Sequence, residues 1–295
     1  MKSFSIQDVV SYGLLVADTF NTYAKDKTAM TPDISSDSLI GGNLIIDGYL
    51  VANDCLISNL LKPIKDQCFY GVLAHYKDNP QKFVTLIRGT GNALEWVDDI
   101  KAIPRAHPIE GSGFVESGFF DIYNSMNYLP ALATKNENNV NKNLSTNAAE
   151  AISQVVSSHN GTLTIAGHSL GSAIATYLMY DIARKPEMHD KTDMCLFASP
   201  KPGNQEFIEA FEKVTDNYVV YNYSSDIVPQ VPPSLIGYQA LNSNTTGYMN
   251  LGIGAKALYW NLDGSQNVAI GNTTLLNNNS GVKNIGIGNK NRLFM

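Results

Sequence analysis

The chain has 295 residues, 44% hydrophobic and 16% charged, which is enough to bury the core of one large domain or of two ordinary ones. No stretch approaches the roughly 18 unbroken apolar residues of a membrane-spanning helix, so an integral membrane protein is excluded. The 21 basic and 27 acidic residues are dispersed and give a net charge of -6, so nucleic acid is not an expected partner.

The cysteines give no sign of a metal site or a disulfide framework. Cys55, Cys68 and Cys195 are far apart and form neither a Cys-x-x-Cys pair nor a Cys/His cluster. We therefore expect no metal and no organic cofactor.

The N-terminal segment predicts a helix rather than a signal peptide. Asp8 stands where the apolar stretch of a signal would open, and no Ala-x-Ala cleavage site follows. Apolar residues instead recur at three- and four-residue steps, as on one face of a helix. The localisation stays open between the cytoplasm and export by a non-standard route. The residues of this face are Ile6, Val10, Leu14, Ala17, Phe20 and Ala24.

Residues 1 to about 235 alternate β-rich and helical segments, the pattern of an α/β fold with a mostly parallel sheet flanked by helices. The Asn-rich stretch 136–147 has no periodicity and predicts a surface loop, with Asn147 as the N-cap of the following helix. The predicted strands cover 69–75, 83–87, 163–166, 194–198 and 218–223, and the predicted helices cover 148–157, 170–184 and 204–213.

The segment Thr162–Ala173 places a serine between a β-branched strand and an apolar helix. The join at 167–171 reads Gly-His-Ser-Leu-Gly, the Gly-x-Ser-x-Gly pattern of a nucleophile elbow. A serine at such a turn is held in a strained backbone, and the residues two before and two after it must lack bulk. We expect the Ser169 hydroxyl to stand above the sheet, with the Leu170 N–H facing a developing oxyanion. Alternation along the strand points His168 away, as a packing residue.

Motifs on both sides of this elbow follow one another in a distinctive order. Val84–Thr90 is followed by Trp96–Asp99 and then by Gly113–Phe119, and after the elbow come Ala198–Asn204 and Tyr223–Pro233. In this order they resemble the class 3 lipases, the fungal-type triacylglycerol lipase family, over residues 1 to about 235. The resemblance implies an α/β-hydrolase fold and a serine hydrolase of carboxylic esters, with a lipid ester as substrate.

The same resemblance assigns roles to individual residues. Ser169 would be the nucleophile, Thr90 and the Leu170 N–H would stabilise the oxyanion, and Asp226 would be the acid of the triad. Asp226 also follows a β-rich run, which places it at the carboxyl edge of a parallel sheet, where such folds carry their sites. The alternative for Asp226 is a turn starter before Pro229. Residues 91–105 would form either a lid with a lipid-facing apolar side or an ordinary surface helix.

The sequence departs from the family at the base of the triad. Acyl transfer by serine needs a general base, and in this fold the histidine follows the acid. No histidine follows Asp226, and the family's usual histidine in Val-His-x-Gly-Phe, which is not the catalytic one, is Glu116 here. The chain is therefore an impaired hydrolase, or His107 substitutes for the base, or Ser169 is not used and the protein binds acyl chains or glycans.

The last sixty residues form a second domain, 236–295, with a period of 17. Ile-Gly recurs at 236, 253, 270 and 287, and Leu241, Leu258 and Leu275 keep the same step. A fixed short period with alternating apolar and polar residues predicts a β-solenoid, whose coils bury their apolar faces by stacking. The alternative is a disordered Asn/Gly-rich tail.

These repeats resemble the head repeats of trimeric adhesins and phage tail fibres. The resemblance implies a homotrimer. The alternative is a monomeric β-extension of the first domain. Two functions therefore compete: an esterase of the lipase type, and a non-catalytic binding protein associated with a fibre or adhesin.

Overall fold

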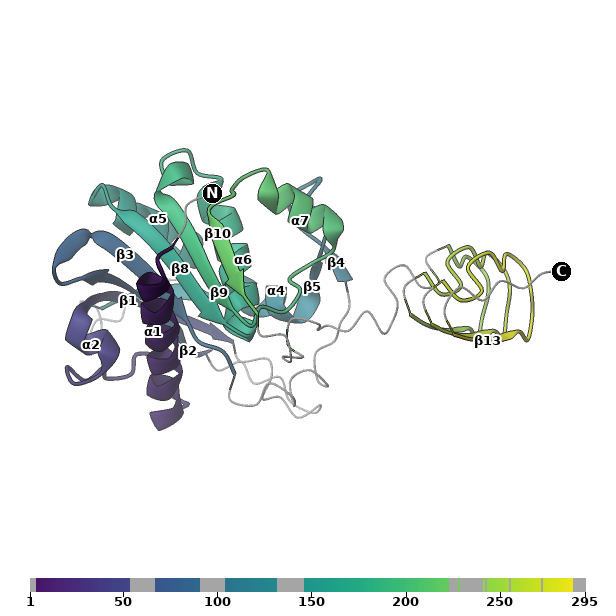
Figure 1. The fold of residues 1–295 in the computed structure, drawn as a ribbon, viewed down its shortest axis with the longest axis horizontal. Coiled ribbons are helices and arrows are strands. Elements are labelled where there is room, and N and C mark those ends of the chain that lie inside the picture. Colours follow the sequence, from purple (N-terminus) through teal and green to yellow (C-terminus); the bar gives the residue numbers. More distant parts are fainter. Residues whose placement is uncertain are drawn as a thin grey trace. The chain divides into compact units, whose positions relative to one another are not determined.

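The computed structural model describes residues 4–53, 67–90, 104–131, 146–222, 228, 241, 243–254, 256–271 and 273–288. The chain divides into two compact units, Met1–Pro229 and Gln230–Met295, each considered by itself (Figure 1). No helix in the described ranges combines the length and the apolar character needed to cross a lipid bilayer.

The first unit is built on an eight-stranded sheet of order β10-β9-β8-β3-β2-β1-β6-β7, with a separate pair β4-β5. The predicted α/β class is confirmed, and the sheet is mixed. The strands from β10 to β3 are parallel, and those from β3 to β7 are antiparallel. The strands are β1 Leu44–Asn53, β2 Gln67–Tyr76, β3 Asn79–Ile87, β4 Pro104–Ala106, β5 Phe114–Glu116, β6 Asn127–Pro130, β7 Thr146–Asn147, β8 Thr162–His168, β9 Thr192–Phe197 and β10 Tyr218–Tyr221.

The parallel half of the sheet brings four strand ends to one edge. Ile87 of β3 is in register with Gly167 of β8, and His168 of β8 with Phe197 of β9. Phe197 is in turn in register with Tyr221 at the end of β10. The segments that follow β3, β8, β9 and β10 therefore all start at this carboxyl edge, where α/β folds carry their sites.

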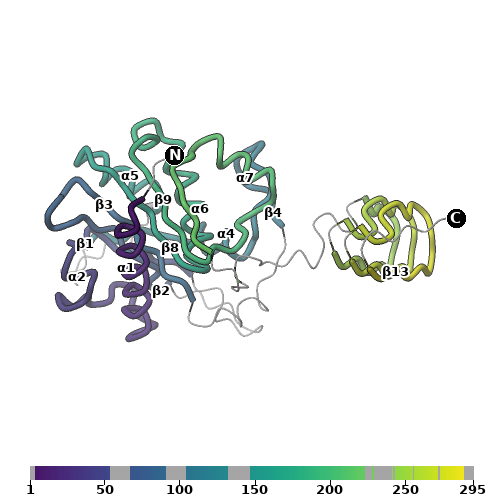
Figure 2. The backbone as a smooth tube through the Cα atoms, in the orientation of Figure 1, coloured from purple at the N-terminus to yellow at the C-terminus, as the bar shows by residue number. Residues whose placement is uncertain are grey.

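Helices cover both faces of the sheet (Figures 1 and 2). α1 packs on one face, where the Tyr12 hydroxyl donates to Oγ1 of Thr164 on β8. α6 packs against β3, β8 and β9 on the other face and is buried along nearly its whole length, as its apolar sequence predicts. The helices are α1 Ile6–Lys25, α2 Leu39–Asn43, α4 Ser117–Asn124, α5 Ala148–Ser158, α6 Leu170–Ala183 and α7 Gln205–Glu212, with a 3-10 turn at His189–Lys191.

The predicted N-terminal helix is present, but the face that packs on the sheet is not the one that the apolar spacing marks. Leu14 is 52% exposed, whereas its neighbour Leu15 is 4% exposed. Val10 and Ile6, about one and two turns before Leu14, are exposed as well. The buried face carries hydroxyl and aromatic groups that the apolar spacing overlooks, namely Tyr12, Thr19, Thr22 and Tyr23 beside Leu15 and Val16.

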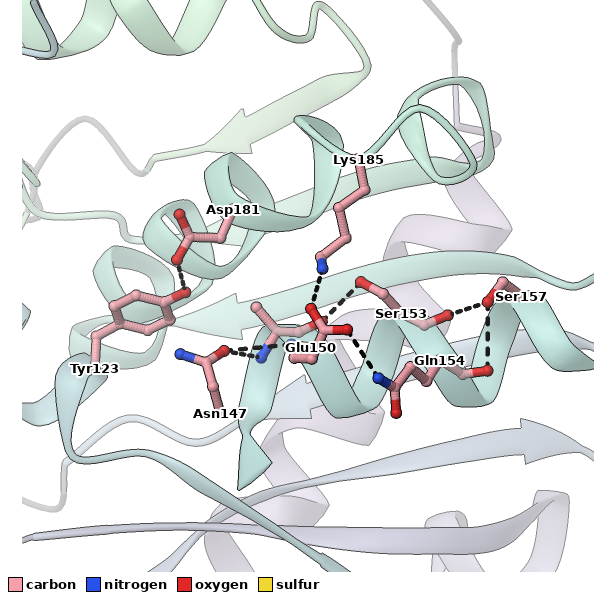
Figure 3. A network of polar contacts seen from close by, with 9 residues as sticks. Tyr123, Asn147, Glu150, Ser153, Gln154, Ser157, Asp181 and Lys185 are labelled. Carbon is pink, nitrogen blue, oxygen red and sulfur yellow. Dashed lines mark hydrogen bonds and ion pairs between the residues drawn. The ribbon is translucent and has the colours of Figure 1, made fainter. Parts of the chain in front are cut away.

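Polar contacts cap α5 and join it to the chain just after α6 (Figure 3). Oδ1 of Asn147 accepts from the N–H groups of Ala149 and Glu150 at 2.9 and 3.3 Å, which confirms the predicted N-cap. Glu150 then forms an ion pair with Lys185 just beyond the end of α6. The predicted surface loop before Asn147 lies mostly outside the described residues.

Among its described residues, the second unit has three short parallel strands, β11 Leu251–Ile253, β12 Val268–Ile270 and β13 Ile285–Ile287, paired in steps of 17 residues. Side-chain amides continue the pairing between the strands. Nδ2 of Asn267 donates to Oδ1 of Asn250, and Nδ2 of Asn284 donates to Oδ1 of Asn267, both at 3.0 Å. A second ladder joins 244, 261 and 278 in the same way.

A small apolar core lies in the second unit beside buried polar residues such as Asn261 and Asn267. This core consists of Ala257, Leu258, Ala269 and Leu275, with Leu241 packed against it. Non-glycine residues with positive φ also recur at the 17-residue step, as at Leu241, Leu258 and Leu275 and at Met249, Gln266 and Lys283. Successive repeats therefore bend at the same positions.

Candidate active site

Ser169 lies at the sharp turn between β8 and α6. Its φ is 53° and its ψ is −127°, a conformation that costs a non-glycine residue of order 1–3 kcal/mol. Two hydrogen bonds hold the turn: the Ser169 N–H donates to the Phe197 carbonyl at 2.9 Å, and the Ser172 N–H donates to the Ser169 carbonyl at 2.8 Å. The strained backbone that the Gly-x-Ser-x-Gly pattern predicts is present.

Steric contacts explain the two glycines around the serine. A Cβ on Gly167 would lie 2.6 Å from the carbonyl oxygen of Gly171. A Cβ on Gly171 would lie 2.5 Å from the carbonyl oxygens of both Ile87 and Arg88, at the end of β3. Real Cβ atoms do not approach so closely, so the elbow closes against β3 only because both positions lack a side chain.

The segment after β3 reaches the elbow. A Cβ on Gly89 would lie 3.3 Å from Cβ of Ser169 and 3.0 Å from Nδ1 of His168. Thr90, the residue expected to assist the oxyanion, follows directly. The structure therefore brings Gly89 close to Ser169, and the role of Thr90 in the oxyanion hole stays a prediction.

Two hydroxyl groups in this region are buried without a hydrogen-bond partner among the described residues, Oγ of Ser169 and Oγ1 of Thr90. Buried hydroxyls normally find a partner, and exceptions mark sites of chemistry or binding. Ser169 also caps α6 without a side-chain hydrogen bond, so its Oγ is not engaged by the helix that begins at Leu170. The N-terminus of that helix favours negative charge beside the serine.

The Ser169 side chain is covered rather than open. It is 1% exposed, and Leu170 is fully buried. The sequence predicts a hydroxyl standing above the sheet, and the turn does place Ser169 at the carboxyl edge, but its side chain is enclosed there rather than exposed to solvent.

Asp226, the predicted acid of the triad, lies outside the described residues. β10 ends at Tyr221, whose carbonyl accepts from the Ala198 N–H at 2.9 Å, and Asp226 follows five residues later. The chain thus leaves β10 at the same edge as the elbow. The predicted lid at 91–105 also lies almost entirely outside the described residues, since β4 begins only at Pro104.

No imidazole among the described residues is hydrogen-bonded to Ser169. All five histidines are among the described residues, and Oγ of Ser169 has no partner there. His168 is exposed, so its interpretation as a packing residue is wrong. Its ring lies beside Gly89 at the same edge, as the contact with Nδ1 indicates.

The structure does not bring His107 to Ser169. The His107 ring packs against Phe120, Tyr180 and Phe207, with centroids 5.2 to 5.7 Å apart. Tyr180 is ten residues after Leu170, which is about 15 Å along α6 at about 1.5 Å per residue. Burial lowers the pKa of His107, and its Nδ1 accepts from the Ile109 N–H at 3.1 Å.

The sequence does not predict the surroundings of two further residues. Arg88 is 1% exposed at the end of β3, and Glu116 is buried at the N-cap of α4. Oε2 of Glu116 accepts from the Phe119 N–H at 3.0 Å, and Oε1 has no partner among the described residues. Burial raises the pKa of Glu116 to about 7. The only sequence feature that hints at the burial of Arg88 is its place directly after an apolar strand.

A family model for class 3 lipases matches residues 84–236, more than half of the chain. The chain belongs to the class 3 lipase family. Among curated members, this class 3 lipase is 29% identical over 162 residues to the chloroplastic phospholipase A(1) DAD1 of Arabidopsis thaliana, covering 50% of this chain and 33% of that protein. It is 28% identical over 169 residues to phospholipase A1-II 5 of Oryza sativa subsp. indica, covering 51% and 35%. The matched region is thus about a third of these relatives.

Solved structures show the same fold at lower identity. The triacylglyceride lipase of Rhizomucor miehei superimposes with a TM-score of 0.56 at 18% identity, covering 79% of this chain and 77% of that one. A triacylglycerol lipase whose catalytic centre is formed by a serine protease triad gives a TM-score of 0.55 at 19% identity, covering 80% and 78%. At these identities the similarity establishes the fold.

Proposed function

We propose that this class 3 lipase is a serine hydrolase of carboxylic esters that acts on acyl esters of glycerolipids. The observation that carries the proposal is the strained Ser169, whose buried hydroxyl has no partner among the described residues and which meets the Gly89–Thr90 segment. The names of its curated relatives support a phospholipid, and the structural relatives support a triacylglycerol, as the substrate class.

In the proposed reaction, Oγ of Ser169 attacks the ester carbonyl and forms a tetrahedral intermediate. The N–H groups of Leu170 and Thr90, with the Thr90 hydroxyl, stabilise the negative oxygen, because preorganised donors lower the barrier where charge develops. The ester C–O bond then breaks, and the alcohol leaves with the proton that the Ser169 hydroxyl gave up. Water next attacks the acyl carbonyl, the bond between the acyl carbon and Oγ breaks, and the acid leaves while a proton from the water restores the hydroxyl. Asp226 would orient the base of the triad.

The base is the weak element of this scheme. No histidine follows Asp226 in the sequence, and none is hydrogen-bonded to Ser169. Loss of the base costs about six orders of magnitude in kcat in a well-studied serine protease, while the oxyanion hole and binding retain about a thousandfold over water. We therefore propose slow turnover, measurable on activated esters.

Labelling with a fluorophosphonate probe tests the proposal directly. Ser169→Ala should abolish labelling and the hydrolysis of p-nitrophenyl butyrate. Ser172→Ala is the matched control, because Ser172 is a buried serine of the same elbow whose hydroxyl donates to the Phe197 carbonyl at 2.9 Å. Equal labelling of wild type and Ser169→Ala, or no labelling of the folded wild type, would overturn the assignment.

An assembly role is the second candidate, and the second unit favours it. We propose that this unit is a short β-solenoid of stacked 17-residue coils, which the strand register and the asparagine ladders support. The outward side chains of its strands are aliphatic, and Ile285 is 74% exposed. A homotrimer would cover such a face. Light scattering tests this assembly, and a monomeric mass would contradict it.

A further inference from the structure

The side chain of Arg88 links three elements of the first unit next to the elbow. Its Cζ lies 3.5 Å from the ring centroid of Tyr23 on α1 and 4.3 Å from that of Tyr70 on β2. Guanidinium groups stack favourably on aromatic faces, and such contacts are strongest away from water. Arg88 is 1% exposed, so both ring contacts are shielded from water.

The guanidinium also donates hydrogen bonds to two backbone carbonyls. Nε donates to the Phe69 carbonyl at 2.7 Å, and Nη1 donates to the Gly89 carbonyl at 2.9 Å. Nη2 lies 3.4 Å from Sγ of Cys68. The planar fork of Arg88 therefore spans from the backbone of β2 to the segment that follows β3.

The bond to Gly89 has a consequence for the next residue. A peptide unit is planar and trans, so the carbonyl of Gly89 and the N–H of Thr90 point in opposite directions. Fixing the Gly89 oxygen thus fixes the direction of the Thr90 N–H. The Arg88 guanidinium also polarises this peptide and makes the Thr90 N–H a stronger donor, because hydrogen bonds in series strengthen one another.

Gly89, at the start of this peptide, lies close to Ser169. The Gly89 Cβ position is 3.3 Å from Cβ of Ser169, and a side chain there would also meet the His168 backbone at 2.9 Å. We infer that Arg88 is a positioning residue of the oxyanion hole, which acts through the Gly89–Thr90 peptide and is itself held by Tyr23 and Tyr70. The inference rests on the proposed function, because it assigns a role within that reaction.

Arg88→Lys is the first test, since it keeps the charge but loses the planar fork and its stacking. A single oxyanion donor is worth about a hundredfold or more in kcat, so a misaligned donor should lower kcat on p-nitrophenyl butyrate about 10- to 100-fold with little change in KM. In the corresponding thionoester, sulfur replaces the carbonyl oxygen in the oxyanion hole and is stabilised little by its hydrogen-bond donors. Arg88→Lys should therefore lower kcat on the thionoester by less than about threefold.

The ratio of oxoester to thionoester rates separates positioning from general damage, because a loosened fold lowers both rates alike. Arg105→Lys is the matched control, since Arg105 also lies over an aromatic ring, that of Phe120 at 5.0 Å, and pairs with Asp121. Tyr23→Leu serves as a second variant, which keeps Arg88 but removes one stacking face. It should shift the ratio in the same direction by a smaller factor.

The outcomes are distinguishable. An unchanged ratio in folded Arg88→Lys or in folded Tyr23→Leu overturns the inference and leaves the proposed function in place. A folded wild type that neither hydrolyses the oxoester nor reacts with fluorophosphonate overturns the proposed function, and the inference with it.

Discussion

A Cβ on Gly171 would lie 2.5 Å from the carbonyl oxygen of Arg88. The turn that carries Ser169 and the segment that leads to Thr90 are therefore in direct backbone contact. The proposed nucleophile is therefore placed beside the segment after β3 by the sheet itself, where β3 and β8 end side by side.

Gly171→Ala tests this contact. The added methyl should destabilise the fold by about 1–3 kcal/mol, the usual cost of overpacking, and should reduce fluorophosphonate labelling of Ser169. Denaturant unfolding measures the first effect. Gly42→Ala is the control, because a Cβ there meets only an ordinary contact at 3.5 Å. Equal stability of Gly171→Ala and Gly42→Ala would contradict the close approach.

Glu116→Gln should change how stability depends on pH. Burial raises the pKa of Glu116 from 4.5 to about 7, so the folded protein retains a proton that the unfolded chain releases. The stability that this proton provides is complete below pH 4.5 and is lost as the pH rises through 7, by about 3 kcal/mol at most.

Glutamine cannot ionise but keeps an oxygen for the Phe119 N–H. The variant should therefore lose less stability than wild type between pH 4.5 and 7 and be the more stable of the two at pH 8. Urea titrations at several pH values measure this, with the exposed Glu187→Gln as control. Parallel pH profiles for wild type and Glu116→Gln would show that Glu116 is not the group responsible.

His107→Ala should affect stability rather than chemistry. Removing a buried ring packed on Phe120, Tyr180 and Phe207 should cost about 3 kcal/mol, while ester hydrolysis well below the melting temperature stays near the wild-type rate. Thermal unfolding and p-nitrophenyl butyrate assays on the same sample decide the matter. Selective loss of hydrolysis in a fully folded variant would restore His107 as the substitute base.

Asn267→Ala should destabilise the second unit. Nδ2 of Asn267 donates to Asn250 and to the Gly281 carbonyl, and its Oδ1 accepts two N–H groups of Asn284. Truncation leaves several of these groups unpaired, at about 1–3 kcal/mol for each buried group. Hydrogen exchange of the strands β11 to β13 measures the loss. Asn277→Ala, at an exposed position, should have no such effect.

The pair Leu14 and Leu15 tests which face of α1 carries the packing. Leu15→Ala should cost about 2–5 kcal/mol as a core truncation, whereas Leu14→Ala should change the free energy of unfolding by less than about 0.5 kcal/mol. Chemical denaturation of the two variants gives the comparison. The reverse order would mean that the spacing of the apolar residues identifies the buried face after all.

The sequence predicted the elements that determine the position of Ser169. The strand before the elbow, the helix after it and the strands β2, β3, β9 and β10 lie close to where the β-rich and helical runs indicated. Such runs are readable because β-branched strands buried on both faces, and apolar helices between them, leave little choice of structure. β1 was not foreseen, and with β2 it forms part of the antiparallel half of the sheet.

Other features depend on contacts that no local pattern contains. The apolar spacing of α1 marks the wrong face because the buried face is chosen by tertiary contacts. Tyr12 donates to Thr164 on β8, and the ring of Tyr23 stacks on Arg88. The burial of Arg88 and Glu116 likewise follows from the elements stacked on them. Asp226 and the base remain predictions, since the former lies outside the described residues and no histidine follows it in the sequence.

The recurrence of positive φ at every seventeenth residue limits how the second unit can vary in length. An insertion or deletion of 17 residues adds or removes one turn of the stack and keeps each leucine and asparagine in line with its counterpart. A change of any other size places core leucines at positions outside the core and moves the asparagine side chains out of register with their hydrogen-bond partners. Natural and engineered variants of this region should therefore differ in length by whole multiples of that number.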